Sequence, residues 1–146
     1  MNHVLTGSCH CGALSLTFET PAAPEVLPLR ICTCSFCAKQ GARYTSDPAG
    51  RAAFTVADPK ALHRYRFGTR TAEILICAKC GTYLAAVTTV EGTLFTAINV
   101  NALDDQAPFA RMPDVTNFAY QTPEQRGERR QSKWTPATLD FAAAAR

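Results

Sequence analysis

Seven cysteines constrain this chain more than any other feature, because they form three short-range clusters and none of them stands alone. The clusters follow the patterns Cys-X-Cys, Cys-X-Cys-X-X-Cys and Cys-X-X-Cys, with a glycine directly after the first and the third. Their members are Cys9 and Cys11, then Cys32, Cys34 and Cys37, then Cys77 and Cys80. Cysteines spaced so closely share a metal ion at low entropic cost, and the glycines let amide N–H groups turn toward sulfur.

The cysteine count and the length of the chain favour metal binding over a disulfide framework. An odd number of cysteines leaves one without a disulfide partner, and 146 residues bury a core without crosslinks. Residues 1–6 lack the basic region and apolar stretch of a signal peptide, and no apolar run is long enough for a membrane span. The sequence therefore predicts a cytoplasmic protein without a membrane segment, in a compartment where thiols stay reduced.

The seven cysteines divide into a four-ligand and a three-ligand zinc site. Two pairs supply four thiolates, which close the tetrahedral shell of zinc as in structural sites. The other three cysteines leave one position for water or substrate, which is typical of catalytic zinc. The predicted structural ligands are Cys9, Cys11, Cys77 and Cys80, and the predicted catalytic ligands are Cys32, Cys34 and Cys37.

Other interpretations of the cysteines stay open from the sequence alone. Cys77 and Cys80 would also suit a redox dithiol, although no βαβ pattern surrounds them. The triplet of Cys32, Cys34 and Cys37 would also suit a structural zinc with a fourth ligand such as His63, or no metal. His10 is expected on the surface rather than at a metal.

Short runs of alternating or β-branched residues predict one mainly β, antiparallel domain over residues 1–146. The expected strands are residues 13–18, 26–31, 53–56, 62–67, 73–76, 83–90 and 94–100. The last two form a hairpin through Glu91-Gly92, and Pro28 places the second at a sheet edge.

Two short helices are expected beside the strands. One runs from Ser35, as its N-cap, to Gly41, and the alanines of residues 137–145 favour another. Residues 121–133 are rich in arginine and poor in apolar side chains, so we expect a solvated connection there. Trp134, directly after it, is expected to dock the C-terminal segment onto the core.

The three cysteine motifs, in this order, resemble the glutathione-dependent formaldehyde-activating enzyme family, which also includes centromere protein V. The matching stretches are residues 7–14, 32–37 and 77–84, with the sequences GSCHCGAL, CTCSFC and CAKCGTYL. Residues 99–105 resemble the strand and turn after the last hairpin of that family, so the resemblance covers roughly residues 5–110. Two departures are Thr33, where histidine is frequent in the family, and Leu75-Ile76, where arginine and an aromatic residue are common.

The resemblance implies a β-tent fold, zinc at both cysteine sites and a carbon–sulfur lyase activity. That activity is the reversible addition of glutathione to formaldehyde, which gives S-(hydroxymethyl)glutathione. The zinc of the triplet would hold the glutathione sulfur as a thiolate or polarise the aldehyde oxygen. Lys39 and Arg43 follow the triplet and are the predicted partners of the two glutathione carboxylates, unless they are ordinary surface charges.

Two other functions remain open: a lyase or isomerase on another thiol adduct, and a zinc-stabilised binding module without catalysis. The net charge of +3 is too small to indicate nucleic acid by itself and suits an anionic small molecule. Salt-sensitive nucleic acid binding by residues 126–133 would favour the binding module. The predicted partner is glutathione or a related small thiol, and the sequence also allows a homo-oligomer.

Overall fold

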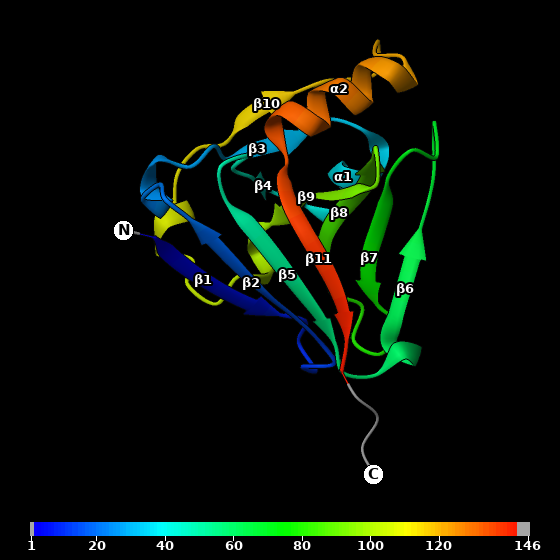
Figure 1. The fold of residues 1–146 in the computed structure, drawn as a ribbon. Coiled ribbons are helices and arrows are strands. Elements are labelled where there is room, and N and C mark those ends of the chain that lie inside the picture. The colour runs from blue at the N-terminus through cyan, green and yellow to red at the C-terminus, as the bar shows by residue number, and fades with distance from the viewer. Residues whose placement is uncertain (1, 143–146) are drawn as a thin grey trace.

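The structure, a computed structural model, describes residues 2–142 (Figure 1). Within these residues eleven strands join one sheet, accompanied by two α-helices and four short 3-10 helices, which confirms the predicted mainly β fold. None of the helices in this part of the chain is long and apolar enough to cross a membrane. In chain order the elements are β1 (His3–Ser8), β2 (Leu14–Thr20), η1 (Pro24–Val26), β3 (Arg30–Cys32), α1 (Ser35–Gln40), β4 (Tyr44–Thr45), β5 (Arg51–Val56), η2 (Pro59–Ala61), β6 (Leu62–Tyr65), β7 (Glu73–Cys77), β8 (Tyr83–Val90), β9 (Thr93–Asn99), η3 (Val100–Ala102), η4 (Ala107–Phe109), β10 (Asp114–Thr116), α2 (Pro123–Lys133) and β11 (Thr135–Phe141).

The sheet branches at β9, which pairs with β4, β8 and β11. One path runs in the order β1-β2-β5-β11-β9-β4-β3-β10, while β8, β7 and β6 continue from β9 as a second arm. In Figure 1, β1, β2, β5 and β11 form the front layer, and α2 lies across its upper end. β11 lies between β5 and β9, parallel to the first and antiparallel to the second, although it follows all the other strands in the chain.

The hairpin of β8 and β9 forms as the sequence predicts. Its strands pair from Val90 and Thr93 inward, and most of their side chains are buried. Glu91 and Gly92 have φ angles of 51° and 81°, as a two-residue hairpin turn with two left-handed residues requires. β7 pairs with the outer edge of β8, so the hairpin positions the strand that ends at Cys77.

The helix predicted at residues 35–41 is α1, and its N-cap lies one residue earlier than expected. Cys34 is the N-cap, because its Sγ accepts a hydrogen bond from the backbone N–H of Cys37. Gly41 ends the helix with a φ of 62°, as predicted. Cys34 therefore both caps the helix and places its sulfur beside those of Cys32 and Cys37.

The prediction of a helix at residues 137–145 is wrong, because residues 137–141 belong to β11. Alanine has the highest intrinsic helix propensity, but tertiary contacts override propensity, and here pairing with β5 and β9 decides the conformation. Residues 143–146, the rest of that prediction, lie outside the described residues.

The prediction of a solvated connection at residues 121–133 is also wrong, because most of that segment forms α2. Thr122 and Gln125 form a reciprocal capping box at its start, and Pro123 occupies the first turn. α2 packs against β8 and β9. Trp134, directly after the helix, is 7% exposed and packs in the core, as predicted.

Two smaller differences concern the early strands. Residues 26–31 do not form one edge strand, because η1 ends at Val26 and β3, which starts at Arg30, lies between β4 and β10. The strands predicted at residues 53–56 and 62–67, with a turn at Asp58-Pro59 between them, correspond to β5 and β6; η2 lies between these strands, and they do not pair with each other. β6 pairs with β7, and β5 pairs with β2 and β11.

Candidate active site

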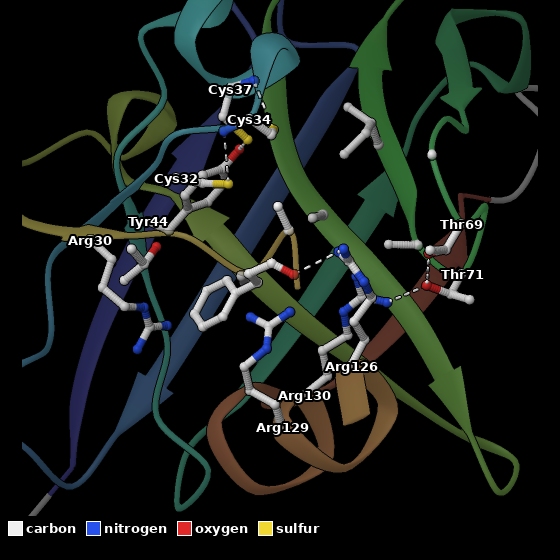
Figure 2. A pocket seen from close by; sticks show the side chains of 18 of the residues that line it. Arg30, Cys32, Cys34, Cys37, Tyr44, Thr69, Thr71, Arg126, Arg129 and Arg130 are labelled. Atoms are coloured by element: carbon white, nitrogen blue, oxygen red, sulfur yellow. Dashed lines mark hydrogen bonds between the residues drawn. The ribbon is translucent and has the colours of Figure 1, made fainter. Parts of the chain in front are cut away.

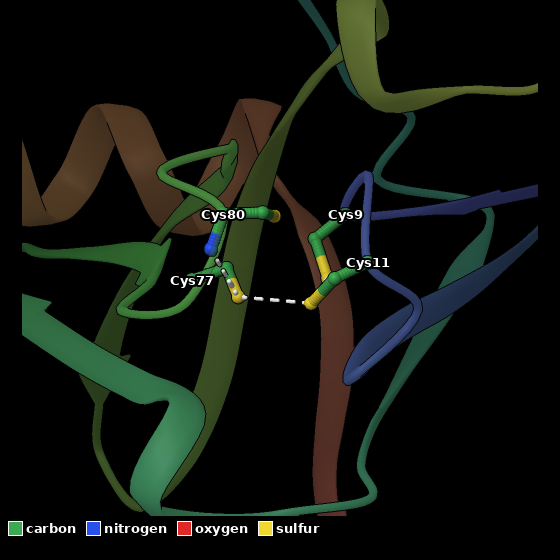
Figure 3. A group of neighbouring side chains, drawn as sticks. All are labelled: Cys9, Cys11, Cys77 and Cys80. Carbon is green, nitrogen blue, oxygen red and sulfur yellow. Dashed lines mark hydrogen bonds between the residues drawn. The ribbon is translucent and has the colours of Figure 1, made fainter.

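Four cysteines come together where the turn after β1 faces the turn between β7 and β8 (Figure 3). All four sulfur atoms, those of Cys9, Cys11, Cys77 and Cys80, lie within 4.8 Å of one another. The Sγ of Cys11 is 3.7 Å from that of Cys9 and 3.6 Å from that of Cys77. A tetrahedral zinc with bonds of about 2.3 Å separates its sulfur ligands by about 3.8 Å, so this group fits zinc.

Backbone and hydroxyl groups around this cluster favour the thiolate form that zinc needs. The N–H of Leu14 donates to the Sγ of Cys9 at 3.3 Å, and the N–H of Cys80 donates to the Sγ of Cys77 at 3.4 Å. Hydrogen bonds from the hydroxyl and backbone of Thr82 lower the pKa of Cys80 to about 5. Such donors orient metal-bound sulfur and support its negative charge.

The other three cysteines gather at the end of β3 and the start of α1, with all sulfur atoms within 4.8 Å. The backbone N–H of Cys34 donates to the Sγ of Cys32 at 3.5 Å, and the backbone N–H of Cys37 donates to the Sγ of Cys34 at 3.4 Å. A hydrogen bond from Cys37 lowers the pKa of Cys32 to about 5, while the same contact and burial raise the pKa of Cys37. The donor set of three soft sulfurs fits zinc with one position left for another ligand.

Within residues 2–142, no fourth histidine, cysteine or carboxylate belongs to this triplet. His63, considered from the sequence as a fourth ligand, is exposed on β6 and belongs to neither sulfur group. His10 is exposed, as expected.

The two cysteine clusters differ in what they face. A cavity of about 600 Å³ is lined by Cys32, Cys34 and Cys37, whereas the four-cysteine cluster lies outside its lining (Figure 2). This volume is within the range of roughly 300–1,000 Å³ that small-molecule sites occupy. Aromatic side chains supply much of its apolar wall, namely Phe67, Tyr83, Phe118 and Trp134.

Two buried tyrosines form a chain of hydroxyl groups that ends at Cys37. The Tyr44 hydroxyl lies 3.1 Å from the Sγ of Cys37 and donates to the Tyr83 hydroxyl at 2.8 Å. Burial raises the pKa of both tyrosines well above their usual range, so both keep their protons at neutral pH. When Cys37 is a thiolate, its Sγ accepts a hydrogen bond from the Tyr44 hydroxyl, and the Tyr83 hydroxyl then donates a hydrogen bond to Tyr44.

We expect Tyr44→Phe to weaken zinc binding at the triplet by about 10- to 100-fold, because it removes a hydrogen bond to a ligand sulfur. Zinc bound by the four-cysteine cluster should keep its affinity. Competition with a chromogenic chelator would measure both classes of site. Tyr65→Phe is the control, since Tyr65 packs on Phe36 near the cavity but is 40% exposed. Equal loss in both variants would contradict the expected role of the Tyr44 hydroxyl.

Four arginines also line the cavity, and sequence reasoning missed them. Arg30 comes from β3, while Arg126, Arg129 and Arg130 come from α2 and point toward the cavity, across which the triplet lies (Figure 2). Arg129 is close enough to Cys32 for its charge to contribute to the lowered pKa of that thiol. The available signal was the capping box before residues 126, 129 and 130, whose spacing places three arginines on one helical face.

Lys39 and Arg43, the cations predicted to bind glutathione, do not line the cavity. Lys39 is exposed in the last turn of α1. Arg43 donates to the side chains of Asn101 and Gln106, both at 3.0 Å, and to the carbonyl of Phe109 at 2.6 Å. The geometry therefore gives Arg43 a structural role and gives neither residue a place beside a ligand in this cavity.

The chain is similar to known proteins over the region that contains its cysteine motifs. A family model described as glutathione-dependent formaldehyde-activating enzyme matches residues 4–120. The chain belongs to this family. A crystal structure of a Rhodobacter sphaeroides protein from a structural genomics programme is 30% identical, with a TM-score of 0.57 over 76% of this chain and 99% of that chain. The family match includes every cysteine and ends before α2, the helix that carries three of the four cavity arginines.

Proposed function

We propose that this family member is a zinc-dependent carbon–sulfur lyase that joins formaldehyde and glutathione reversibly to form S-(hydroxymethyl)glutathione. One observation carries this proposal: three sulfur ligands converge in the wall of a ligand-sized cavity, while the other four converge outside it. A closed four-sulfur group supports a structural zinc, and an open three-sulfur group beside a cavity supports a catalytic one. The proposal treats the whole chain as a single zinc-binding domain, and thiolate ligands suit the reducing cytoplasm.

In the proposed reaction a sulfur–carbon bond forms between the thiol and the aldehyde carbon. The thiol loses its proton, the aldehyde oxygen gains one, and the product carries an S–CH₂–OH group. A zinc ion held by Cys32, Cys34 and Cys37 would supply a lowered pKa for the incoming thiol and keep it as a thiolate.

The residues around the triplet prepare that chemistry. The Tyr44 hydroxyl supports the charge on Cys37, and the backbone N–H of Cys37 supports the charge on Cys34. Phe67, Phe118 and Trp134 exclude water from the cavity wall, which strengthens electrostatic contacts inside it. The cavity arginines hold the anionic part of the substrate so that its sulfur reaches the triplet.

Exchange between formaldehyde and its glutathione adduct, followed by NMR, tests the reaction. The zinc-loaded protein is expected to accelerate exchange above the uncatalysed rate at the same pH and concentrations. Metal analysis is expected to give two zinc ions per chain, and glutathione is expected to perturb only the one at the triplet. An exchange rate equal to the uncatalysed rate would disprove formaldehyde–glutathione chemistry. A lyase or isomerase acting on another thiol adduct would then be the next candidate for this cavity.

The alternative of a nucleic-acid-binding module is less well supported by the site. It depends on the basic segment 126–133 facing solvent, where phosphates would reach it. In the structure Arg126 and Arg129 are half-buried and Arg130 is buried, and all three line the cavity. A small anion therefore suits these arginines better than a polyanionic surface does.

A further inference from the structure

The cavity collects four guanidinium groups and no carboxylate. Arg30, Arg126, Arg129 and Arg130 line it, and no aspartate or glutamate occurs among its described lining residues. None of the ion pairs found within residues 2–142 involves any of these arginines. Each of the four side chains is at least half withdrawn from water, so their charges are not offset by full hydration.

The contacts that the arginines do make are with neutral groups and leave donors free. Arg30 donates to the Ser46 hydroxyl at 2.6 Å. Arg126 donates to the carbonyls of Gln121 and Phe118, at 3.2 and 3.0 Å. Arg129 donates through Nε to the Gln121 side chain at 2.9 Å and lies 3.6 Å from the centre of the Phe118 ring. These contacts fix the guanidinium planes while terminal N–H groups of Arg129 stay available for a ligand.

Arg130 supplies a second observation in favour of a negative charge beside these arginines. Its residue is only 6% exposed, its terminal nitrogen donates to the Thr71 hydroxyl at 2.8 Å, and its Nε has no partner among the described residues. A buried charge without a carboxylate partner is costly, because the protein must supply the stabilisation that water gave. An anion in the adjoining cavity offsets that cost for Arg130 and its neighbours together.

The arginines also act on one another. Burial lowers the pKa of Arg129 to about 10, with a smaller contribution from repulsion by Arg126 and Arg30. Burial likewise lowers the pKa of Arg130 to about 10, with a smaller contribution from repulsion by Arg129 and Arg126. Both groups remain charged at neutral pH. Their mutual repulsion is relieved when an anion binds between them, so the free protein is poised for a ligand with more than one negative charge.

We propose that Arg30, Arg126 and Arg129 form the subsite that selects the substrate, and that it selects thiols bearing two or more carboxylates, with no requirement for an ammonium group. This inference rests on the proposed function of the triplet and names the class of thiol that reaches it. Arginine binds carboxylates through paired N–H donors, and the three arginines supply enough donors and positive charge to bind two carboxylates. An α-ammonium group finds no aspartate or glutamate among the described residues that line this cavity, so it adds no ionic contact.

A series of S-methylated probes tests the selection without any thiol chemistry. Calorimetry on the zinc-loaded protein would compare S-methylglutathione, its N-acetyl derivative, which lacks the ammonium, and its diethyl ester, which lacks both carboxylates. We expect the N-acetyl derivative to bind at least as tightly as S-methylglutathione and the diester to bind at least about 10-fold more weakly. A tenfold loss on N-acetylation, or equal binding of the diester, would overturn the proposal.

Two substitutions locate the effect on the protein. Arg126→Gln and Arg129→Gln are each expected to weaken binding of the N-acetyl probe by about 10- to 100-fold and to leave binding of the diester unchanged. Arg51→Gln is the matched control, since Arg51 is exposed on β5 and pairs with Glu19 away from the cavity. Equal affinities of the N-acetyl probe for wild type, R126Q and R129Q would disprove the assignment. Because the diester serves as an internal reference, a variant that merely disturbs α2 would lose both probes and would also contradict it.

The outcomes separate this inference from the proposed reaction. Charge-dependent binding of the probes without accelerated formaldehyde exchange would leave the subsite standing and remove the reaction. Accelerated exchange with charge-independent binding would keep the reaction and remove the subsite.

Discussion

The Cys77→Ala variant is expected to be unfolded, or to fold only with excess zinc, because it opens the four-cysteine cluster. Cys77 is 1% exposed and its sulfur is 3.6 Å from that of Cys11, so the substitution removes a ligand at the centre of the group. Zinc at a structural site contributes apparent free energies of roughly 10–16 kcal/mol, which rivals the net stability of about 5–15 kcal/mol of a whole domain. Circular dichroism and urea unfolding with defined zinc would measure the loss.

Cys37→Ala is the matched control for this experiment. It truncates another buried cysteine, 8% exposed, in the triplet rather than in the four-cysteine cluster. We expect this variant to keep a cooperative unfolding transition and one zinc ion per chain. Equal unfolding of both variants would show that both clusters are structural and would remove the basis for the division between them.

Cys34→Ser is expected to lower catalysed exchange to the uncatalysed rate while the fold survives. Serine is among the best N-cap residues, so it can replace the Cys34 sulfur as acceptor of the Cys37 N–H at the start of α1. It does not replace a thiolate as a zinc ligand, because a serine hydroxyl is a hard, neutral donor. This one substitution is therefore expected to remove the metal at the triplet while it leaves the stability of the fold nearly unchanged.

The measurements for Cys34→Ser are metal content, urea unfolding and formaldehyde exchange by NMR. The expected result is one zinc ion per chain in place of two, a transition midpoint close to that of the wild type, and no catalysis. Full exchange activity in a variant with one zinc ion would contradict the catalytic role of the triplet. Two retained zinc ions would contradict its role as the second metal site.

The sequence predicted those parts of the structure that depend on local chemistry. The turn at Glu91-Gly92 needs two left-handed residues between β-branched runs, which is a strong local signal for the hairpin of β8 and β9. The cysteines likewise divided by count and spacing into the same two groups that the fold brings together. Cysteine spacing could not predict that the triplet, and not the four-cysteine cluster, would line a cavity. This depends on how β3, α1 and α2 meet.

The failures came where distant contacts decide the outcome. Residues 137–141 alternate apolar and polar side chains, and they form part of β11 because β5 offers hydrogen bonds along the whole segment and β9 pairs with its start. The apolar content of residues 121–133 is low, and this hid α2 although Thr122 and Gln125 gave a capping signal. With the helix missed, its arginines could not be placed at the cavity. Lys39 and Arg43 were predicted from their proximity in sequence to the triplet; they do not line the cavity, and a contact of theirs with glutathione stays a prediction.

The position of β11 has a consequence for how the chain is made. Translation proceeds at roughly 5–20 residues per second from the N-terminus, so β5 and β9 emerge well before the strand that lies between them. Until residues 135–141 leave the ribosome, β5 and β9 each present an unpaired edge toward the missing strand, and such edges are prone to associate with other chains. A nascent molecule of this protein therefore cannot complete its sheet before residues 135–141 have emerged, and until then the edges of β5 and β9 are open to pairing with other strands.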